Sequence, residues 1–180
     1  MSRKKPALRI VTQRSRDNAN RRLTAIPPTT ARRAELSARV SYGPYSKHKL
    51  NPSAYNLAPY SGPDVERTYC DAHAHFGKAD FVRTIDLLKR GVMLGLWSEQ
   101  IERDVPRLLW TIDESGWIFE LRITNYAQVQ YHGYPVLPGD AFARHVLVRA
   151  REVAFAEYEY SVGQDPKARA AIAAAEAFYR

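Results

Sequence analysis

The chain has 180 residues, 45% of them apolar, so it can bury one hydrophobic core of roughly 100–150 residues, and a second core is not expected. Its net charge of +8 is uneven: the first fifty residues carry thirteen Lys and Arg against only Asp17 and Glu35, a local charge of +11. Cys70 is the single cysteine, which excludes an intramolecular disulfide, and no stretch approaches the roughly 18 apolar residues of a membrane span. We therefore expect a cytoplasmic protein that makes no contact with a membrane.

Residues 1–41 are expected to form a basic arm without a core of its own, disordered until it binds. They mix Arg, Ser, Thr and Asn with the pair Pro27–Pro28, and their few apolar residues show no sustained period. Residues 30–40 can form one helix on binding, capped by Thr30. Such an arm suits a phosphate-rich or acidic partner, and a solubilising tail is the simpler alternative. The expected nucleic-acid-binding residues are Arg14, Arg16, Arg21, Arg22, Arg32, Arg33 and Lys47.

Residues 41–63 are rich in Tyr, Pro and Gly, which combines turn-forming residues with aromatic anchors. Disordered linkers avoid aromatic residues, so we expect an ordered loop whose tyrosines lie against the body. This loop would then hold Lys47, His48 and Lys49 on the surface. Ordered loops that present polar groups are common sites of function.

The remaining pattern predicts a single α+β domain over residues 42–180. An amphipathic helix is expected over residues 80–96, where apolar residues recur at spacings of four, three and four. Two further helices are expected near the C-terminus, the first capped by Asp140 and the second beginning at Asp165–Pro166.

Between these helices, alternating patterns predict three strands over residues 108–112, 117–123 and 127–134, with Gly116 in the first turn. In the middle strand the aromatic and aliphatic residues share one face, which leaves Glu120 and Arg122 together on the other. The expected fold is a small antiparallel sheet of three or four strands packed against helices.

A possible metal site lies in the run CDAHAH, where Asp71, His73 and His75 alternate. On an extended segment all three side chains would project to one side, as metal ligands could. The pattern resembles the opening of amidohydrolase and related metal-dependent phosphoesterase barrels, which need about 250 residues and further ligands on later strands. Only 105 residues follow His75. The alternative is a polar cluster, including Arg67, that secures the loop onto the helix, and no cofactor is expected.

A second group of polar residues suits acid–base chemistry on RNA. Metal-independent cleavage needs a base for the 2′-hydroxyl, an acid for the leaving 5′-oxygen and a cation for the charged phosphorane. Glu120 and Arg122 lie close to His132 if the last two strands pair antiparallel, but a slip of one residue removes His132. The alternative is an ordinary solvated sheet face with cross-strand charge pairs. The candidate catalytic residues are His48, Lys49, Glu120, Arg122 and His132.

The runs WTIDESGWIFEL and VQYHGYPV, residues 110–121 and 129–136, resemble the sheet of small bacterial toxin ribonucleases of the Barnase, EndoU, colicin E5 and RelE group. The resemblance covers roughly residues 47–136. It implies a helix before an antiparallel sheet and RNA cleavage without metal, with His48, Glu120 and His132 loosely matching acid, base or substrate-holding positions. The Tyr-rich loop and the C-terminal helices have no counterpart in that group.

Two classes of function follow. As an enzyme, the protein is expected to be a metal-independent endoribonuclease in which His48 and His132 act as acid and base in unassigned order. As a non-enzymatic accessory protein, it would bind nucleic acid through its basic arm. The same charges also fit an acidic protein partner such as an antitoxin or immunity protein.

Overall fold

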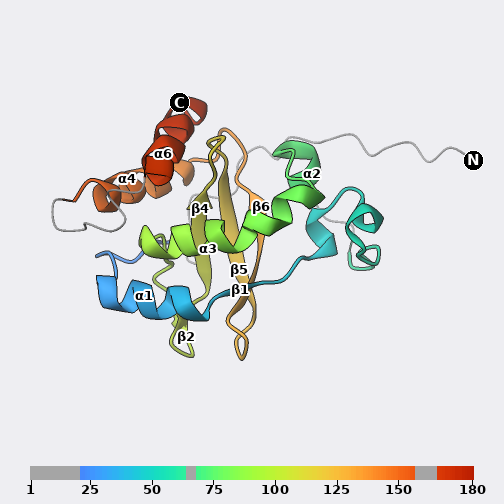
Figure 1. Ribbon diagram of the computed structural model, residues 1–180, viewed down its shortest axis with the longest axis horizontal. Helices are drawn as coiled ribbons and strands as arrows, with labels where there is room; N and C mark the ends of the chain where they lie inside the picture. Colours follow the sequence, from blue (N-terminus) through green and yellow to red (C-terminus); the bar gives the residue numbers. More distant parts are fainter. Residues whose placement is uncertain (1–20, 64–67, 157–165) are drawn as a thin grey trace, which may run out of the picture.

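The computed structural model describes residues 21–63, 68–156 and 166–180. The remaining residues, among them Arg14, Arg16 and Arg67, lie outside the described part. The described chain is α+β, as predicted, with helices packed around a four-stranded sheet and a separate two-stranded sheet (Figure 1). None of the described helices is both long and apolar enough to cross a membrane.

The elements follow the predicted order along the chain. The helices are α1 (Thr30–Arg39), α2 (Cys70–His73), α3 (Thr84–Met93), α4 (Ala143–Ala154) and α6 (Pro166–Phe178), with short 3₁₀ helices at Ser46–His48, Pro52–Tyr55 and Lys78–Arg83. The strands are β1 (Ser41–Tyr42), β2 (Ile101–Glu102), β3 (Val105–Pro106), β4 (Leu108–Ile112), β5 (Ile118–Asn125) and β6 (Gln130–Pro135). The predicted helix over residues 80–96 is confirmed as a 3₁₀ turn that continues into α3, and both C-terminal helices are confirmed.

The predicted three-stranded meander is formed by β4, β5 and β6, which pair antiparallel. Gly116 lies in the β4–β5 turn with φ of 90°, a left-handed conformation that glycine adopts without a steric penalty. A Cβ at this position would lie 2.8 Å from the backbone of Ala174 in α6, so the turn also needs glycine for close packing.

The fourth strand corrects the expected antiparallel sheet. β1 pairs with β6 in parallel, which gives a mixed sheet in the order β1–β6–β5–β4. β1 has only two residues, Ser41 and Tyr42, and so offers no alternation from which a strand could be predicted. It directs the following loop onto β6.

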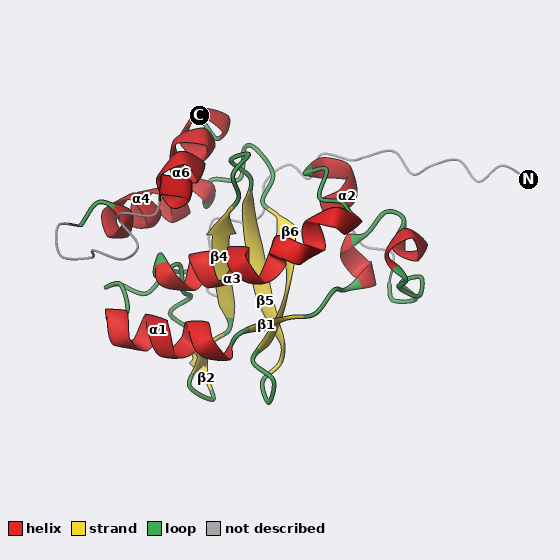
Figure 2. Cartoon of the chain, in the orientation of Figure 1, coloured by secondary structure: helices red, strands yellow, loops and turns green. Residues whose placement is uncertain are grey.

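Helices cover both faces of the sheet (Figure 2). On one face, α1 and α3 bury an apolar cluster that includes Leu36, Leu88, Val92, Leu109, Leu121 and Tyr131. On the other face, α4 and α6 pack on a cluster that includes Trp110, Ile112, Ile118, Val146, Ala150 and Ile172. The second face continues beyond these helices onto the polar residues of β5 and β6, where the candidate site lies.

Residues 21–41 belong to the folded body, so the arm boundary expected at residue 41 is wrong. The backbone amide of Thr24 donates to the Trp97 carbonyl over 3.0 Å, and α1 buries Leu36 in the core. Arg33 is fully buried, and its guanidinium donates to the Met93 carbonyl over 2.8 Å. The helix expected over residues 30–40 forms as α1, but Thr29 rather than Thr30 is its N-cap. It packs in the core without a bound partner, because an arginine such as Arg33 can bury its stem and still satisfy its charged head.

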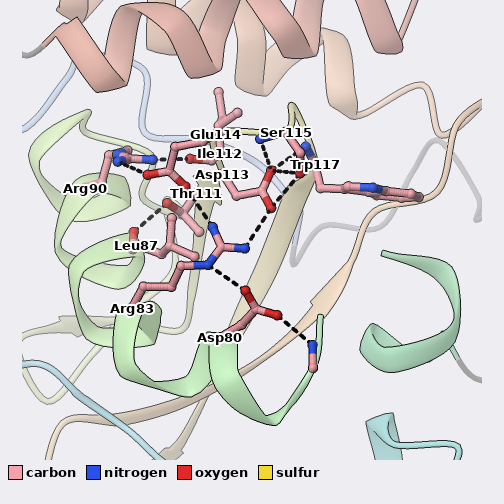
Figure 3. Close-up of polar contacts among 11 residues, drawn as sticks. Asp80, Arg83, Leu87, Arg90, Thr111, Ile112, Asp113, Glu114, Ser115 and Trp117 are labelled. Atoms are coloured by element: carbon pink, nitrogen blue, oxygen red, sulfur yellow. Dashed lines mark hydrogen bonds and ion pairs between the residues drawn. The ribbon is translucent and has the colours of Figure 1, made fainter. Parts of the chain in front are cut away.

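A network of charged side chains joins α3 to the β4–β5 turn (Figure 3). Arg83 bonds Asp80 and Glu114 over 2.9 and 2.7 Å, and Arg90 bonds Glu114 over 2.6 Å. Asp113 is 1% exposed and accepts hydrogen bonds from the backbone amides at positions 115 and 117, over 3.0 and 2.9 Å. This carboxylate fixes the turn that sets the register of β5.

Asp113→Ala should lower the free energy of unfolding by about 1–3 kcal/mol, because it leaves the part-buried amide donors of the turn without their acceptor. Glu114→Ala is the matched control at the next position, where the carboxylate is partly exposed and its ion pairs contribute only about 0–1 kcal/mol. Urea unfolding followed by circular dichroism measures both. Equal losses in the two variants would contradict the role given to Asp113.

Candidate functional site

Two histidines from distant parts of the sequence stack on each other at the sheet. His48 ends the 3₁₀ helix that follows β1, and His132 lies in β6. Their ring centroids are 5.2 Å apart and the ring planes are inclined by 17°. The Tyr134 ring also stacks on His48, with a centroid separation of 4.6 Å. His48 and His132 are only 6% and 5% exposed. The loop that carries His48 therefore packs on β6 and buries this histidine, which was expected on the surface.

The strand register places the predicted sheet residues on one face. Arg122 pairs with His132 across β5 and β6, and Glu120 pairs with Tyr134. Directly opposed residues of an antiparallel pair project to the same side. The prediction that Glu120, Arg122 and His132 share a face is therefore confirmed. Arg122 is exposed, whereas the other residues of this group are buried.

The environment of His132 favours a neutral imidazole. Burial lowers the pKa of His132 to about 4, and the positive charges of Arg122 and Lys47 act in the same direction. Its Nδ1 atom has no hydrogen-bond partner among the described residues. At neutral pH this ring can therefore accept a proton.

The backbone fixes the orientation of the His48 ring. Its Nδ1 atom lies 3.1 Å from the carbonyl oxygen of Thr68. A carbonyl can only accept a hydrogen bond, so Nδ1 must carry the hydrogen. Nε2 is then the nitrogen through which His48 can exchange a proton with a substrate.

Glu120 is buried and hydrogen-bonded to its neighbours, an arrangement that suits an orienting role rather than direct contact with a substrate. Its carboxylate is 1% exposed and accepts hydrogen bonds from Arg21 Nε over 2.6 Å, from Trp110 Nε1 over 3.2 Å and from the Tyr134 hydroxyl. Because the Tyr134 ring stacks on His48, Glu120 acts on the histidine pair through Tyr134.

Arg21 is the cation that balances Glu120, although the sequence predicted it in a nucleic-acid-binding arm. It is 7% exposed, and it also bonds Asp140 over 2.9 Å and lies 4.8 Å above the Phe142 ring. Burial alone would lower the pKa of Arg21, but Glu120 and Asp140 outweigh this effect and raise it. A chain of contacts thus leads from Arg21 through Glu120 and Tyr134 to His48.

Lys49 lies outside the catalytic group to which the sequence assigned it. The side chain is 3% exposed, and its ammonium lies 4.7 Å from the Tyr55 ring and 4.9 Å from the Phe81 ring. It is therefore enclosed by aromatic faces and cannot stabilise a phosphorane beside the histidines. Burial raises the pKa of the nearby Cys70 thiol to about 11 despite the charge of Lys49, which makes this thiol a poor nucleophile.

The other predicted nucleic-acid-binding residues have different environments. Arg32 is partly exposed and pairs with Asp104 and Glu35 over 2.7 and 2.8 Å, and Arg33 is buried in α1. Arg22 remains exposed, 3.9 Å from Glu99. Lys47 is half-buried with its ammonium 5.9 Å from the Tyr60 ring, and its charge acts on His132.

The CDAHAH run is helical rather than extended, so the proposed convergence of metal ligands does not form. Asp71 accepts hydrogen bonds from the amides of Leu50 and Asn51 over 2.9 and 3.1 Å, and it secures the loop that carries His48. His73 contacts Tyr69, and His75 adopts a positive φ of 51° after α2 has ended. The described part of the chain contains no group of three or more side chains that could hold a metal ion.

Tyr45 and Tyr134 are site residues that the sequence prediction missed. Tyr134 follows His132 by two positions in a strand, so the same-face rule could have identified it. The Tyr45 ring lies edge-on to His132, 5.0 Å away, and to His48, 6.2 Å away, and this residue is 40% exposed. No local pattern indicates that contact, because it depends on how the loop folds over β6.

The site therefore combines a neutral histidine, a second histidine with a fixed ring orientation, and nearby cations, held in place by a buried carboxylate. Comparison of the chain with protein-family models, with curated proteins and with solved structures finds no match, so the site itself is the basis for assigning a function.

Proposed function

We propose that the protein is a metal-independent endoribonuclease that cleaves RNA phosphodiesters at the His48–His132 pair. The observation that carries this proposal is the stacking of two imidazoles beside Arg122 and Lys47. Two adjacent imidazoles can supply the base and the acid of the reaction, and the two cations can stabilise charge that develops on phosphorus.

The protonation state of His132 assigns the two roles. Neutral His132 takes the proton of the ribose 2′-hydroxyl as O2′ forms a bond to phosphorus. Arg122 and Lys47 stabilise the resulting phosphorane. Protonated His48 gives its Nε2 proton to O5′ as the bond from phosphorus to O5′ breaks. The products are a 2′,3′-cyclic phosphate and a 5′-hydroxyl, and His132 ends with the proton of the 2′-hydroxyl while His48 ends neutral.

Tyr45 controls access to this pair. Its ring contacts both imidazoles and is itself partly exposed, so a substrate that reaches the imidazoles must displace it. The displaced ring can then stack on a base, since aromatic side chains bind bases of any sequence through their faces. As RNA enters, the Tyr45 ring would in this way leave the two imidazoles and stack on a base of the RNA.

The direct test is incubation of the full-length protein with mixed tRNA, ribosomal RNA and DNA, with and without EDTA. Cleavage of RNA in both conditions, with intact DNA, is expected because the reaction uses the 2′-hydroxyl and no metal. RNA that is shifted in a gel but remains intact would contradict the enzyme and favour a non-enzymatic nucleic-acid-binding protein. Cleavage abolished by EDTA would contradict the proposed chemistry.

The pH dependence of kcat/KM should show an acid limb near the His132 pKa of about 4, because the base must be neutral in the free enzyme. Arg122→Gln removes a charge that lowers this pKa, so the acid limb should move to higher pH. Arg107→Gln, a change at another exposed arginine, should leave the limb in place. A limb that does not move in Arg122→Gln would contradict the assignment of His132 as the base.

A further inference from the structure

A basic groove lies beside the candidate site. It has a volume of about 560 Å³ and runs between residues 21–25 and α4. Four arginines line it, against two glutamates: Arg21, Arg22, Arg144 and Arg149 against Glu99 and Glu152. Three of these arginines have acidic partners, since Arg21 pairs with Glu120 and Asp140, Arg149 with Glu152, and Arg22 lies 3.9 Å from Glu99. Arg144 is therefore the lining cation that can bind an anionic ligand without giving up an ion pair within the described residues.

The arginines of the groove divide into a structural pair and a solvent-facing pair. Arg21 and Arg149 are 7% and 8% exposed, and Arg149 donates to the Thr24 carbonyl over 2.6 Å, which holds residues 21–25 against α4. Arg22 and Arg144 are exposed, and Arg144 has no ion-pair partner within the described ranges. The first pair builds the wall of the groove, and the second pair is available to a ligand.

The exposed face of α4 continues from the groove residues Arg144 and Val148 to Arg151 and Phe155, where Arg151 pairs with Glu176 over 3.1 Å and lies 5.8 Å from the Phe155 ring centroid. Arg144, Val148, Arg151 and Phe155 follow one another at spacings of four, three and four, and so share one helix face. Val148 is 62% exposed and Phe155 is 53% exposed. Arginine beside exposed apolar and aromatic side chains is the combination that binds single-stranded nucleic acid, because phosphates meet the cations and bases meet the apolar surface.

The position of the groove connects it to the histidine pair and to the basic N-terminal residues. Arg21 lines the groove and also bonds Glu120, whose carboxylate holds Tyr134 against His48. Residues 1–20 carry six Lys and Arg against Asp17 alone, and they join the chain at Arg21. A polyanion in the groove would therefore lie at the attachment point of a strongly basic segment, next to the arginine that is linked to the candidate active site.

We infer that this groove binds the sugar–phosphate backbone of single-stranded RNA, an inference that rests on the proposed ribonuclease function for the role of that RNA as substrate. The volume falls in the range of roughly 300–1,000 Å³ that small-ligand pockets have. A groove of this volume suits a short stretch of a single strand. The groove binds substrate beyond the cleaved bond, and the histidine pair performs the reaction.

Binding is measured by fluorescence anisotropy with a short 2′-O-methyl oligonucleotide, which lacks the attacking hydroxyl and so cannot be cleaved by this mechanism. The double variant Arg22→Glu/Arg144→Glu should weaken binding at least about tenfold and reduce the slope of log K against log salt by about 0.7 for each phosphate that the variant no longer neutralises. The matched control Lys89→Glu/Arg107→Glu makes the same change in net charge at exposed positions outside the groove and should retain the parent affinity and slope. Equal losses in the two double variants would overturn the inference.

Cleavage is measured separately on a long single-stranded RNA and on a dinucleotide. The groove variant should lower the ratio of kcat/KM for the long substrate to kcat/KM for the dinucleotide, because only the long substrate reaches the groove.

The binding and cleavage results together separate the two proposals. If the groove variant loses oligonucleotide binding while neither it nor the parent cleaves RNA, RNA binding in the groove is supported and the ribonuclease proposal fails. If the parent cleaves RNA and the groove variant binds the oligonucleotide normally, the ribonuclease proposal is supported and the proposal that RNA binds in the groove is contradicted. An oligoglutamate peptide that displaces the oligonucleotide at equal concentration would overturn RNA as the ligand in favour of an acidic protein.

Discussion

His132→Ala should lower kcat/KM for RNA cleavage by about 10²–10⁴-fold, since removal of a positioned acid or base costs a reaction this much. His48→Ala should cause a loss of the same size. The double variant should lose little more than either single variant, because groups that act as a unit in one step have non-additive effects. These rates are compared with the parent on a single labelled RNA.

The control for this series is His75→Asn. His75 is an exposed histidine outside the candidate site, at a positive φ that asparagine tolerates. It should retain parent activity, and all variants should retain the parent circular dichroism spectrum. Activity within about threefold of the parent in His132→Ala, with an intact fold, would remove His132 from the mechanism, because a positioned base contributes far more than this. The same result in His48→Ala would remove His48.

Arg21→Met should lower the free energy of unfolding by about 3–5 kcal/mol, the cost of leaving one partner of a buried ion pair without its counter-charge. Arg21 lies at 2.6 Å from Glu120, and their side chains are 6% and 2% exposed. Methionine keeps much of the packing volume of the arginine stem, so the loss reports the charge rather than a cavity. Urea unfolding measures the difference from the parent.

A double-mutant cycle isolates this interaction. Glu120→Gln keeps the shape of the side chain and an acceptor for Tyr134 but removes the charge, so Arg21→Met/Glu120→Gln should recover part of the stability lost in Arg21→Met. The remaining loss reports the second ion pair of Arg21, with Asp140. Arg22→Met, at the exposed neighbouring position, should change stability by no more than about 0.5 kcal/mol. A loss in Arg21→Met as small as that in Arg22→Met would contradict the structural role of the buried pair.

The secondary structure of the sheet and the C-terminal helices could be predicted because their patterns are local. Strand alternation placed Glu120 and Arg122 on one face, and antiparallel pairing then brought His132 to the same face. The helix expected after Asp140 forms as α4, although its N-cap is Phe142, and the Asp140 carboxylate instead accepts a hydrogen bond from the Phe142 amide over 3.0 Å in the preceding turn. In each case a repeat of apolar residues along the sequence was enough to predict the strand or helix.

The other features depend on tertiary contacts that no local pattern reports. Lys49 was predicted on the surface, but the aromatic residues of two separate segments enclose it. Arg21 was predicted in a free arm, yet Glu120, ninety-nine residues away, pairs with it. A charged residue in a sequence is by default assigned to solvent, and only the fold shows which charges have buried partners.

The same reasoning explains why the candidate site was predicted only in part. His48 and His132 were both named, but their stacking follows from β1, a two-residue parallel strand that directs the loop over β6. The alternation in CDAHAH suggested a metal site because alternation was taken to mean extended backbone. In the structure Cys70–His73 form a single helical turn that ends before His75, and Asp71 holds the His48 loop in place.

The proposed mechanism is tested most directly by the chemistry of the fragment ends that the full-length protein leaves on RNA in the presence of EDTA. In-line attack by the 2′-hydroxyl at the His48–His132 pair predicts fragments that end in 2′,3′-cyclic phosphates and begin with 5′-hydroxyls, and these fragments should be absent with His48→Ala. Fragments with 3′-hydroxyl and 5′-phosphate ends, or cyclic phosphates that persist in His48→Ala, would contradict the proposed mechanism.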